Sequence, residues 1–584
     1  MCRSIERAVS RIRVPLLIIL DVLLLSILGL NIVYDFSKLH STIYYDISFY
    51  VSVLAIPILI LVVFFNITIA VLNVDEGRLT LIWVLLIPFI YVMEVLVNYP
   101  NTWARDVYLH GQIWELNIYG KLYSIHYLYP KEYPGFFLTL YEIYNVLGIR
   151  DIRVANLFVF YPALMLVLMI LIYLASQRMF RNRVYAIITS IMAFNLLQFN
   201  RNELTFIHAN TRLYALIQIL LIFYAMLLLQ GNKHQFVALF IPATTLAISH
   251  PLFQLVPPSM LLFLVVLRIL SRLRGGRYEL ESKYLPMYLL LVALIVLAWN
   301  IYNYYNYNYT VKIGITSFFN YLYHVMGWEL ISTSITIRET LPFIGIFLRN
   351  YYKVTIASTT LIALIYVFRR MLNNKLSYEE VVTSSLAGAI GIVFLSTVFT
   401  ASLGNSIDRM LISLPIPTTI LFIKAISSLN SLKIKLNNAW KLVIVVTLVF
   451  TTLAGYLLVH EESVLHAATI PLDNASLYMK NYTDSVNDVT VTSPFGIYYQ
   501  FFDPSVSIRT IRIDLVNNLS DVIPRLLSNQ GVKVVDLRSV IIWGLRYNNL
   551  HRALREFDAF ILTSLSSHCN LVYNNGVYER VYIG

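Results

Sequence analysis

The sequence predicts a multi-pass α-helical membrane protein of about 13 transmembrane helices that ends in a small extracytoplasmic α/β domain. Composition and pattern both lead to this class. Hydrophobic residues make up 58% of the 584-residue chain and charged residues 13%, whereas soluble domains hold about 45–50% and about 25%. Long apolar stretches recur up to residue 459, and shorter strand-like and helix-like segments follow.

Thirteen apolar stretches approach or exceed the roughly 20 residues that cross a bilayer. They are Val14–Tyr34, Phe49–Val74, Leu79–Val97, Val154–Leu174, Val184–Gln198, Leu213–Leu229, Phe236–Ile248, Leu252–Leu270, Tyr284–Tyr302, Val354–Phe368, Val381–Ala401, Met410–Ile423 and Leu442–Val459. The fifth, seventh, tenth and twelfth stretches are short, so tilt or an adjoining polar turn has to complete them.

Basic residues orient these helices, because cytoplasmic loops carry an excess of Lys and Arg. With the N-terminus in the cytoplasm, the inner segments hold 21 Lys and Arg in 75 residues, against 13 in about 146 residues of the outer loops. The sequence therefore predicts a plasma-membrane protein whose C-terminal domain is extracellular. The net charge of +12 is then a signal of topology, and nucleic acid is not an expected partner.

This map divides the chain into three parts. Residues 1–78 form two N-terminal transmembrane helices, residues 79–459 form a transmembrane module, and residues 460–584 form the outer α/β domain. The module has two long outer loops, 98–153 and 303–353, and the aromatic content of the first predicts short helices in the membrane interface.

Within residues 460–584 the pattern predicts several short elements. They are strands at Asp488–Thr492, Val506–Ile511, Lys533–Leu537 and Ala559–Thr563, helices at 519–527 and Tyr547–Phe557, and a hairpin over Asn570–Ile583. No glycine-rich phosphate loop opens these helices, so no nucleotide cofactor is expected.

Polar residues gather where the outer loops meet the membrane. Arg105, Asp106 and His110 follow the third stretch, and Asp106 and His110 share a face if this segment is helical. A carboxylate there suits a general base or a metal ligand, and a solvated Arg–Asp pair is the plainer alternative. Whether a divalent cation takes part is left open by the sequence.

Two further clusters and one histidine lie at the same predicted surface. Glu203 and Arg212 belong to a polar turn between the fifth and sixth stretches, which is either a site or an interfacial anchor. Arg409 begins a hydrophobic segment, where it either holds a lipid phosphate with its planar fork or snorkels to the interface. His250 is either a structural residue of its turn or a further member of the site.

These segments form an ordered pattern. Arg105-Asp106-Val107-Tyr108-Leu109-His110 is followed by Tyr119-Gly120-Lys121 and by Tyr129-Pro130-Lys131-Glu132-Tyr133-Pro134-Gly135 before an apolar stretch, and Asp408-Arg409 later leads towards Pro415. The arrangement resembles multi-spanning glycosyltransferases of the GT-C fold, prokaryotic and archaeal members included. The overall plan is similar to oligosaccharyltransferase catalytic subunits, although their W-W-D-Y-G type signature is absent.

The resemblance implies transfer of a sugar from a polyprenyl-phosphate donor to an extracytoplasmic acceptor, which is a glycan, a lipid or a protein. It implies Asp106 as the general base, with inversion at the sugar. For this reaction, the polar residues at the outer surface that we predict to bind the substrate are Arg105, His110, Glu203, Arg212, His250 and Arg409.

Two other classes of function stay open. A transporter or flippase of lipid-linked sugars or other amphiphiles is the first, although transporters typically show internal repeats and broken helices near the midplane. Here the polar residues gather at the outer surface instead. A receptor or structural protein is the second, and it leaves the aromatic-rich loop 98–153 unexplained.

Overall fold

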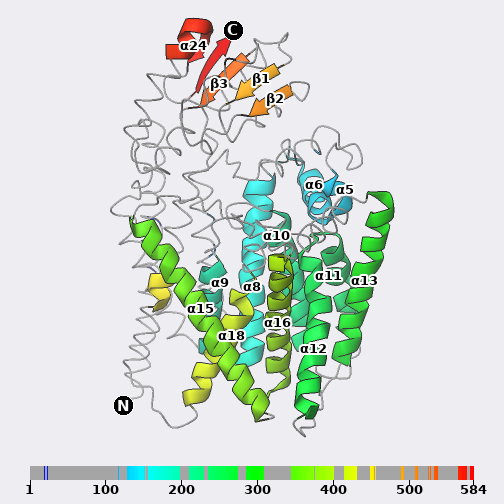
Figure 1. Ribbon diagram of the computed structural model, residues 1–584. Coiled ribbons are helices and arrows are strands. Elements are labelled where there is room, and N and C mark those ends of the chain that lie inside the picture. Colours follow the sequence, from blue (N-terminus) through cyan, green and yellow to red (C-terminus); the bar gives the residue numbers. More distant parts are fainter. Residues whose placement is uncertain are drawn as a thin grey trace, which may run out of the picture.

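Apolar helices run up and down beside one another, and a small β-sheet lies beyond one end of them (Figure 1). This computed structural model describes residues 128–149, 155–197, 210–228, 235–273, 284–307, 343–373, 375–399, 413–430, 447–452, 488–491, 507–510, 532–536, 563–574 and 579–583. It also describes the single residues 19, 23, 26, 88, 92, 113, 116, 152, 454, 524 and 527.

Nine of the predicted apolar stretches, from Val154–Leu174 to Met410–Ile423, contain described helices. The helices are α5 (Tyr129–Glu132), α6 (Gly135–Leu147), η3 (Ala155–Phe160), α8 (Tyr161–Phe180), α9 (Arg183–Leu197), α10 (Thr211–Leu228), α11 (Gln235–Ala247), η5 (Phe253–Leu255), α12 (Val256–Leu273), α13 (Tyr284–Asn306), α15 (Phe343–Leu372), α16 (Tyr378–Phe399) and α18 (Pro415–Asn430). Five helical segments in the described part, within α8, α10, η5–α12, α13 and α15, are long and apolar enough to cross a membrane.

Two boundaries differ from the sequence prediction. The tenth stretch was expected to be short, but α15 has 30 residues, so Phe343–Lys353 at the end of the predicted outer loop is helical, and the apolar span within α15 is Val354–Leu372. The twelfth was expected to begin at Met410, but α18 begins at Pro415, because proline suits the first turn of a helix. The total of about 13 helices stays a prediction, because the first three stretches and most of the last lie outside the described residues.

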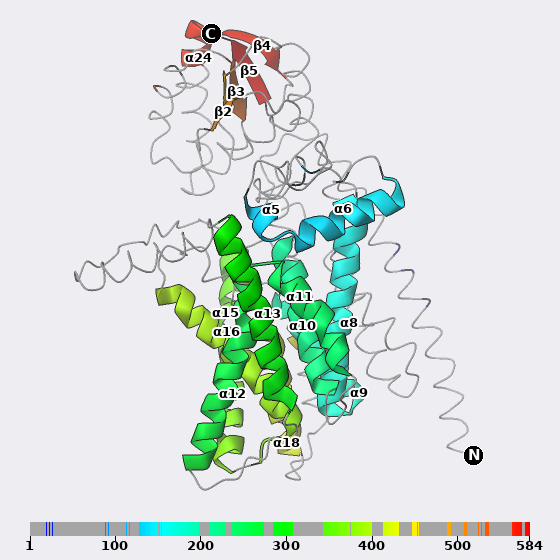
Figure 2. The same cartoon turned by 90° about the vertical axis from the view of Figure 1, so that its right-hand side faces the viewer.

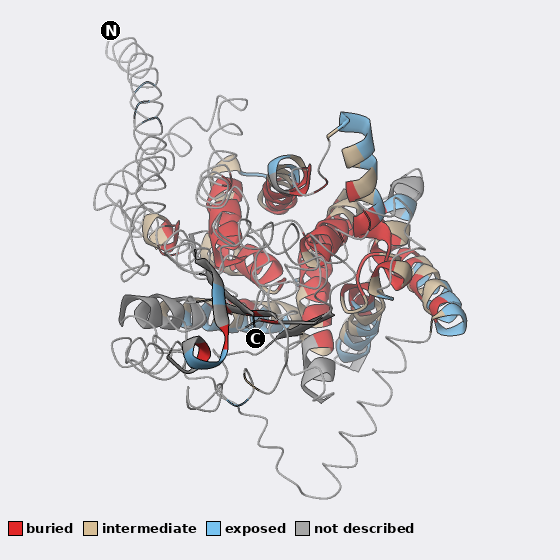
Figure 3. Ribbon diagram, turned by 90° about the horizontal axis from the view of Figure 1, so that it is seen from above, coloured by how far each residue is buried: buried red, intermediate tan, exposed pale blue. Residues whose placement is uncertain are grey.

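The helices differ in how much of their surface other helices cover. About 72% of the apolar window of α10 is buried, against 17% of that of α15. Figure 3 shows buried residues where helices face one another and exposed residues on the outward sides of peripheral ones. The exposed apolar side chains of α12, α13 and α15 include Leu262, Leu290 and Leu361. In a bilayer such side chains face lipid.

Several hydroxyl groups inside the bundle bond to a backbone carbonyl of their own helix. Thr189 Oγ1 donates to the Tyr185 carbonyl oxygen at 2.6 Å, and Ser385 Oγ donates to the Val381 carbonyl oxygen at 2.7 Å. Because a bilayer core offers no water, every polar group there has to find a protein partner. Small residues also allow close packing, since a Cβ on Gly388 of α16 would overlap the ring of Phe263 on α12.

The sheet has the strand order β2-β1-β3-β5-β4. Its strands are β1 (Asp488–Val491), β2 (Ser507–Thr510), β3 (Val532–Asp536), β4 (Asn570–Asn574) and β5 (Glu579–Ile583). β1 pairs in parallel with β2 and β3, whereas β5 pairs antiparallel with β3 and β4. The β4–β5 hairpin lies where it was predicted. Thr563 begins the helix α24 (Thr563–His568), so the strand predicted over Ala559–Thr563 is wrong at that residue.

The two ends of the bundle differ in chemistry. The "α5 end" carries α5 and α6, and α6 lies across the helices below it (Figure 2). The sheet lies beyond this end in both side views. The opposite "basic end" carries Arg178, Arg181, Arg268, Arg370 and Lys424 on the helix termini that meet there. Cytoplasmic ends of membrane helices are typically basic, so the predicted orientation places the α5 end outside.

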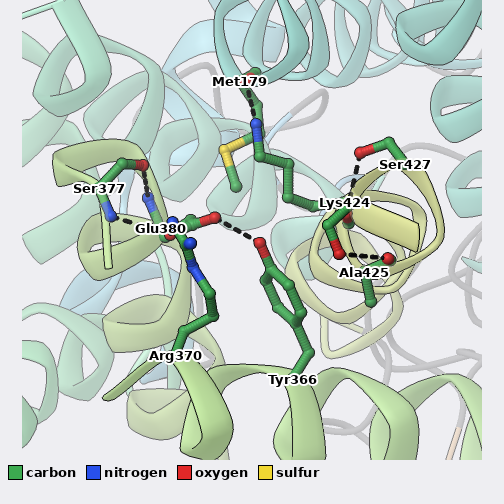
Figure 4. A network of polar contacts seen from close by, with 9 residues as sticks. Met179, Tyr366, Arg370, Ser377, Glu380, Lys424, Ala425 and Ser427 are labelled. Atoms are coloured by element: carbon green, nitrogen blue, oxygen red, sulfur yellow. Dashed lines mark hydrogen bonds and ion pairs between the residues drawn. The ribbon is translucent and has the colours of Figure 1, made fainter. Parts of the chain in front are cut away.

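A buried carboxylate joins two helices at the basic end (Figure 4). Glu380 Oε1 accepts from the Tyr366 hydroxyl at 2.6 Å, and Oε2 accepts from the Ser377 amide at 2.8 Å. Arg370 Nη2 lies 3.2 Å from the same Oε2. The Glu380 amide in turn donates to Ser377 Oγ, which completes a capping box at the start of α16. One side chain therefore caps α16 and holds it against α15.

We expect Glu380→Ala to destabilise the bundle by about 2–4 kcal/mol, because it leaves the Tyr366 hydroxyl, the partly exposed Arg370 and a helix cap without their partner. The measurement is the thermal unfolding of the purified protein in detergent. Glu379→Ala is the matched control, since its ion pair with the exposed Arg181 is 3.9 Å long and is worth about 0–1 kcal/mol. An equal loss of stability in both variants would contradict this role for Glu380.

Candidate functional site

Two prolines shape the chain at the α5 end. Pro130 occupies the first turn of α5, where its missing amide leaves no partner unsatisfied. Pro134 follows Tyr133, whose φ of −129° and ψ of 69° lie outside the helical region. The proline ring disfavours the helical conformation in the residue before it. The helix α5 therefore ends at Glu132, and α6 starts in a new direction.

Gly135 brings a distant turn against this bend. Its amide donates to the Ile248 carbonyl oxygen at 2.9 Å. A Cβ on Gly135 would lie 2.9 Å from Ser249 Oγ and 3.1 Å from the Ile248 carbonyl oxygen. The contact therefore needs glycine, and it places the turn after α11 beside α5.

His250 lies in that turn and is buried, with 3% of its surface exposed. Its Nδ1 accepts a hydrogen bond from the Leu252 amide at 3.2 Å. Its ring stands edge-on to those of Phe253 and Tyr129, with centroids 5.2 Å and 6.5 Å away. Because Nδ1 is an acceptor, a neutral His250 carries its proton on Nε2 and can donate there.

Arg212 lies in the first turn of α10, next to Thr211. Asn210 caps this helix through Oδ1, which accepts from the amides of Arg212 at 3.0 Å and Leu213 at 2.8 Å. The Tyr129 hydroxyl donates to Thr211 Oγ1 at 3.4 Å. A cation in a first turn opposes the helix dipole, so Arg212 does not serve the stability of α10. Together with the positive end of that dipole, it favours an anion at this position.

Glu132 supplies a carboxylate and a backbone acceptor to the same region. The residue is buried, with 1% of its surface exposed. Its carbonyl oxygen accepts from Trp299 Nε1 and from Asn303 Nδ2, each at 3.0 Å. These two bonds fasten α5 to the upper part of α13, where Tyr304 and Tyr305 are exposed. Exposed tyrosines at a helix end are typical of a membrane–water interface.

Of the predicted site residues, the structure describes Arg212 and His250, and it brings both to the α5 end, where Tyr129 contacts His250 and Thr211, the residue before Arg212. The others lie outside the described residues. They are Asp106, Arg105, His110, Glu203 and Arg409. Within the described part of the chain, no three His, Cys, Asp or Glu residues lie close enough together to hold a metal ion.

Sequence reasoning did not single out Glu132, Trp299 or Asn303 as site residues. Glu132 had one usable signal, because a lone carboxylate in an aromatic, proline-rich segment before an apolar helix is unusual. Trp299 and Asn303 had none, because their partner lies 167 and 171 residues away along the chain.

This geometry can bind an amphiphile with a phosphate. Arg212 supplies a cation with a planar fork, and the Thr211 hydroxyl and Nε2 of His250 are potential donors at the same end of the bundle. The exposed apolar helices below can contact an aliphatic chain. Glu132 adds a buried carboxylate on α5, whose backbone is bonded to α13.

No family model matches the chain, and no curated protein matches it. Solved structures are similar to it. For the apo oligosaccharyltransferase of Archaeoglobus fulgidus, the TM-score is 0.48 and the identity 12%, over 85% of this chain and 82% of that one. For the archaeal oligosaccharyltransferase AglB from the same organism, with an inhibitory peptide and a dolichol-phosphate, the TM-score is 0.46 and the identity 12%, over 81% and 72%.

ArnT from Cupriavidus metallidurans, bound to undecaprenyl phosphate, is similar at a TM-score of 0.45 and 10% identity, over 86% of this chain and 97% of that one. Oligosaccharyltransferase and ArnT are both glycosyltransferases of the GT-C fold that depend on polyprenyl phosphates. The sequence motifs resemble the same class of glycosyltransferase.

Proposed function

We propose that the chain is a membrane glycosyltransferase that moves a sugar from a polyprenyl-phosphate donor to a glycan, lipid or protein acceptor outside the membrane. The observation that carries the proposal is that Tyr129 of α5 contacts both His250 and Thr211, the neighbour of Arg212, while the buried Glu132 lies on the same short helix. A cation for phosphate, a carboxylate for a proton and an apolar flank for a lipid tail lie at one end of one bundle.

In this reaction the acceptor oxygen or nitrogen attacks the anomeric carbon while the bond from that carbon to the phosphate oxygen breaks. The bonding electron pair leaves with the polyprenyl phosphate, and a carboxylate takes the acceptor proton. Attack opposite to the leaving phosphate inverts the anomeric centre. Cations beside the phosphate stabilise the charge that develops there.

Each predicted residue has a role in this proposal. Asp106 is the general base, and the residues that bind the substrate are Arg105, His110, Glu203, Arg212, His250 and Arg409. Arg212 and His250 hold the phosphate through the fork and Nε2. Glu132 is a rival for the base, because it belongs to the same predicted outer loop and is buried at the α5 end. Whether transfer needs a divalent cation is a separate question. It is answered by measuring transfer with and without a chelator.

Asp106→Asn tests the base. The change is nearly isosteric, and positioned general-base catalysis contributes about 10²–10⁴ in rate. We expect transfer from a radiolabelled polyprenyl-phosphate sugar to fall by about that factor, with donor affinity retained.

Glu132→Gln is the paired variant. A loss of transfer in Glu132→Gln together with normal transfer in Asp106→Asn would assign the base to Glu132. If the wild type transfers none of a panel of lipid-linked sugars but moves them between leaflets, the flippase alternative replaces the transferase.

Arg212→Lys tests the phosphate contact. Lysine keeps the charge but loses the bidentate fork, and a hydrogen bond to a charged group is worth about 1.5–3 kcal/mol. We expect the Kd for polyprenyl phosphate to rise by about 10-fold to 100-fold. Arg268→Lys, at an exposed position near the basic end, is the control and should leave this Kd unchanged. Unchanged binding by Arg212→Lys would remove Arg212 from the donor site.

A further inference from the structure

Two buried carboxamides lie beside the site but have no role in the reaction described above. Gln254 lies on η5, four residues after His250, and has 3% of its surface exposed. Asn303 lies on the upper part of α13 and has 2% exposed. Both side chains are more than nine-tenths buried at the α5 end.

A relay of hydrogen bonds fixes the orientation of the Gln254 amide. Asn300 Nδ2 donates to the Val296 carbonyl oxygen at 2.9 Å. A backbone carbonyl can only accept a hydrogen bond, so the group of Asn300 that faces Val296 is the NH₂ group. The group that faces Gln254 is therefore the oxygen, Oδ1. Gln254 Nε2 donates to that Oδ1 at 3.1 Å. The NH₂ group of Gln254 therefore faces α13, and its Oε1 is directed away from Asn300.

A second backbone carbonyl fixes the orientation of Asn303. Its Nδ2 donates to the Glu132 carbonyl oxygen at 3.0 Å, beside the bond from Trp299 Nε1. Flipping the amide would set two carbonyl oxygens against each other. Asn303 Oδ1 is therefore directed away from α5.

Both of these outward-directed oxygens lack a donor. Within the described part of the chain, Gln254 Oε1 and Asn303 Oδ1 are buried and accept no hydrogen bond. Buried acceptors are normally satisfied. Asn300 and Asn303 are three residues apart on α13 and so share a face of that helix, which places the Gln254 and Asn303 side chains on the same side of α13.

The chemistry of the two oxygens restricts their partner. Both carry partial negative charge and no formal charge, so they repel a phosphate and attract an uncharged hydroxyl or N–H donor. Under the proposed function, the group of the donor that is rich in hydroxyls and joined directly to the phosphate is the sugar.

We propose that Gln254 Oε1 and Asn303 Oδ1 form a subsite that accepts hydrogen bonds from hydroxyl groups of the sugar on the lipid donor. The inference rests on the proposed function and adds a determinant of specificity to it. A site that hydrogen-bonds a substrate hydroxyl rejects analogues that lack the hydroxyl, because its buried acceptors are then left unpaired.

Gln254→Leu in the purified full-length chain tests this subsite. The probes are a polyprenyl-phosphate sugar and the same polyprenyl phosphate without its sugar. Because one neutral hydrogen bond is lost, we expect Kd for the sugar-bearing lipid to rise about 3-fold to 10-fold, with Kd for the bare lipid unchanged. A panel of mono-deoxy sugars supplies a second arm. The wild type should bind at least one of them more weakly by a similar factor, and Gln254→Leu should bind that one as well as it binds the parent sugar.

Asn195→Leu is the matched control, because it removes another buried amide, which donates to Thr452 Oγ1 in the bundle. It should lower the temperature of unfolding and leave the ratio of the two Kd values unchanged. If Gln254→Leu does not fold, binding of the mono-deoxy sugars by the wild type tests the subsite instead. Equal affinity for all of them and for the parent sugar would overturn the subsite.

Two other outcomes also overturn the subsite. One is an unchanged ratio of Kd values in a folded Gln254→Leu, which would leave the acceptors to water or to another part of this chain. The other is a wild type that binds neither lipid, which would overturn the proposed function itself and the subsite with it.

Discussion

A single backbone hydrogen bond, from the Gly135 amide to the Ile248 carbonyl oxygen, joins two turns that are more than 100 residues apart. The bend at Tyr133-Pro134 presents Gly135, and the absence of a Cβ lets the turn at Ser249 approach. His250 and Gln254 then lie beside α5, and the Glu132 carbonyl oxygen receives its two donors from α13. Without this contact, nothing would hold the turn that carries His250 and Gln254 beside α5.

The two ends of the bundle differ in how their buried polar side chains are hydrogen-bonded. At the basic end, Glu380 caps α16 and pairs with Tyr366 and Arg370 of α15, so its carboxylate is fully used. At the α5 end, the NH₂ groups of Gln254 and Asn303 bond to Asn300 and to the Glu132 carbonyl oxygen, whereas their oxygens accept no hydrogen bond from the described residues. A buried polar group whose hydrogen bonds are all made stabilises the fold, whereas a buried acceptor without a donor can bind a ligand.

The helices could be predicted because a bilayer demands long apolar stretches, and Val154–Leu174 and its eight successors contain described helices. The hairpin could be predicted from Asn574-Asn575-Gly576, but the place of β1 between β2 and β3 depends on long-range pairing. The site was predictable only in part. Arg212 and His250 stood out as polar residues in short turns, whereas Asn303 looked like an ordinary helix residue until its partner on α5 was known.

The central claim is that the sugar-phosphate group of the donor binds at the α5 end. Photo-crosslinking tests it most directly, with a polyprenyl-phosphate sugar that carries a diazirine on the sugar, added to the full-length chain and mapped by mass spectrometry. The account predicts labelled peptides from residues 128–135, 248–255 and 299–303, with labelling competed by unmodified donor. Labelling confined to residues 366–380 at the basic end would contradict it.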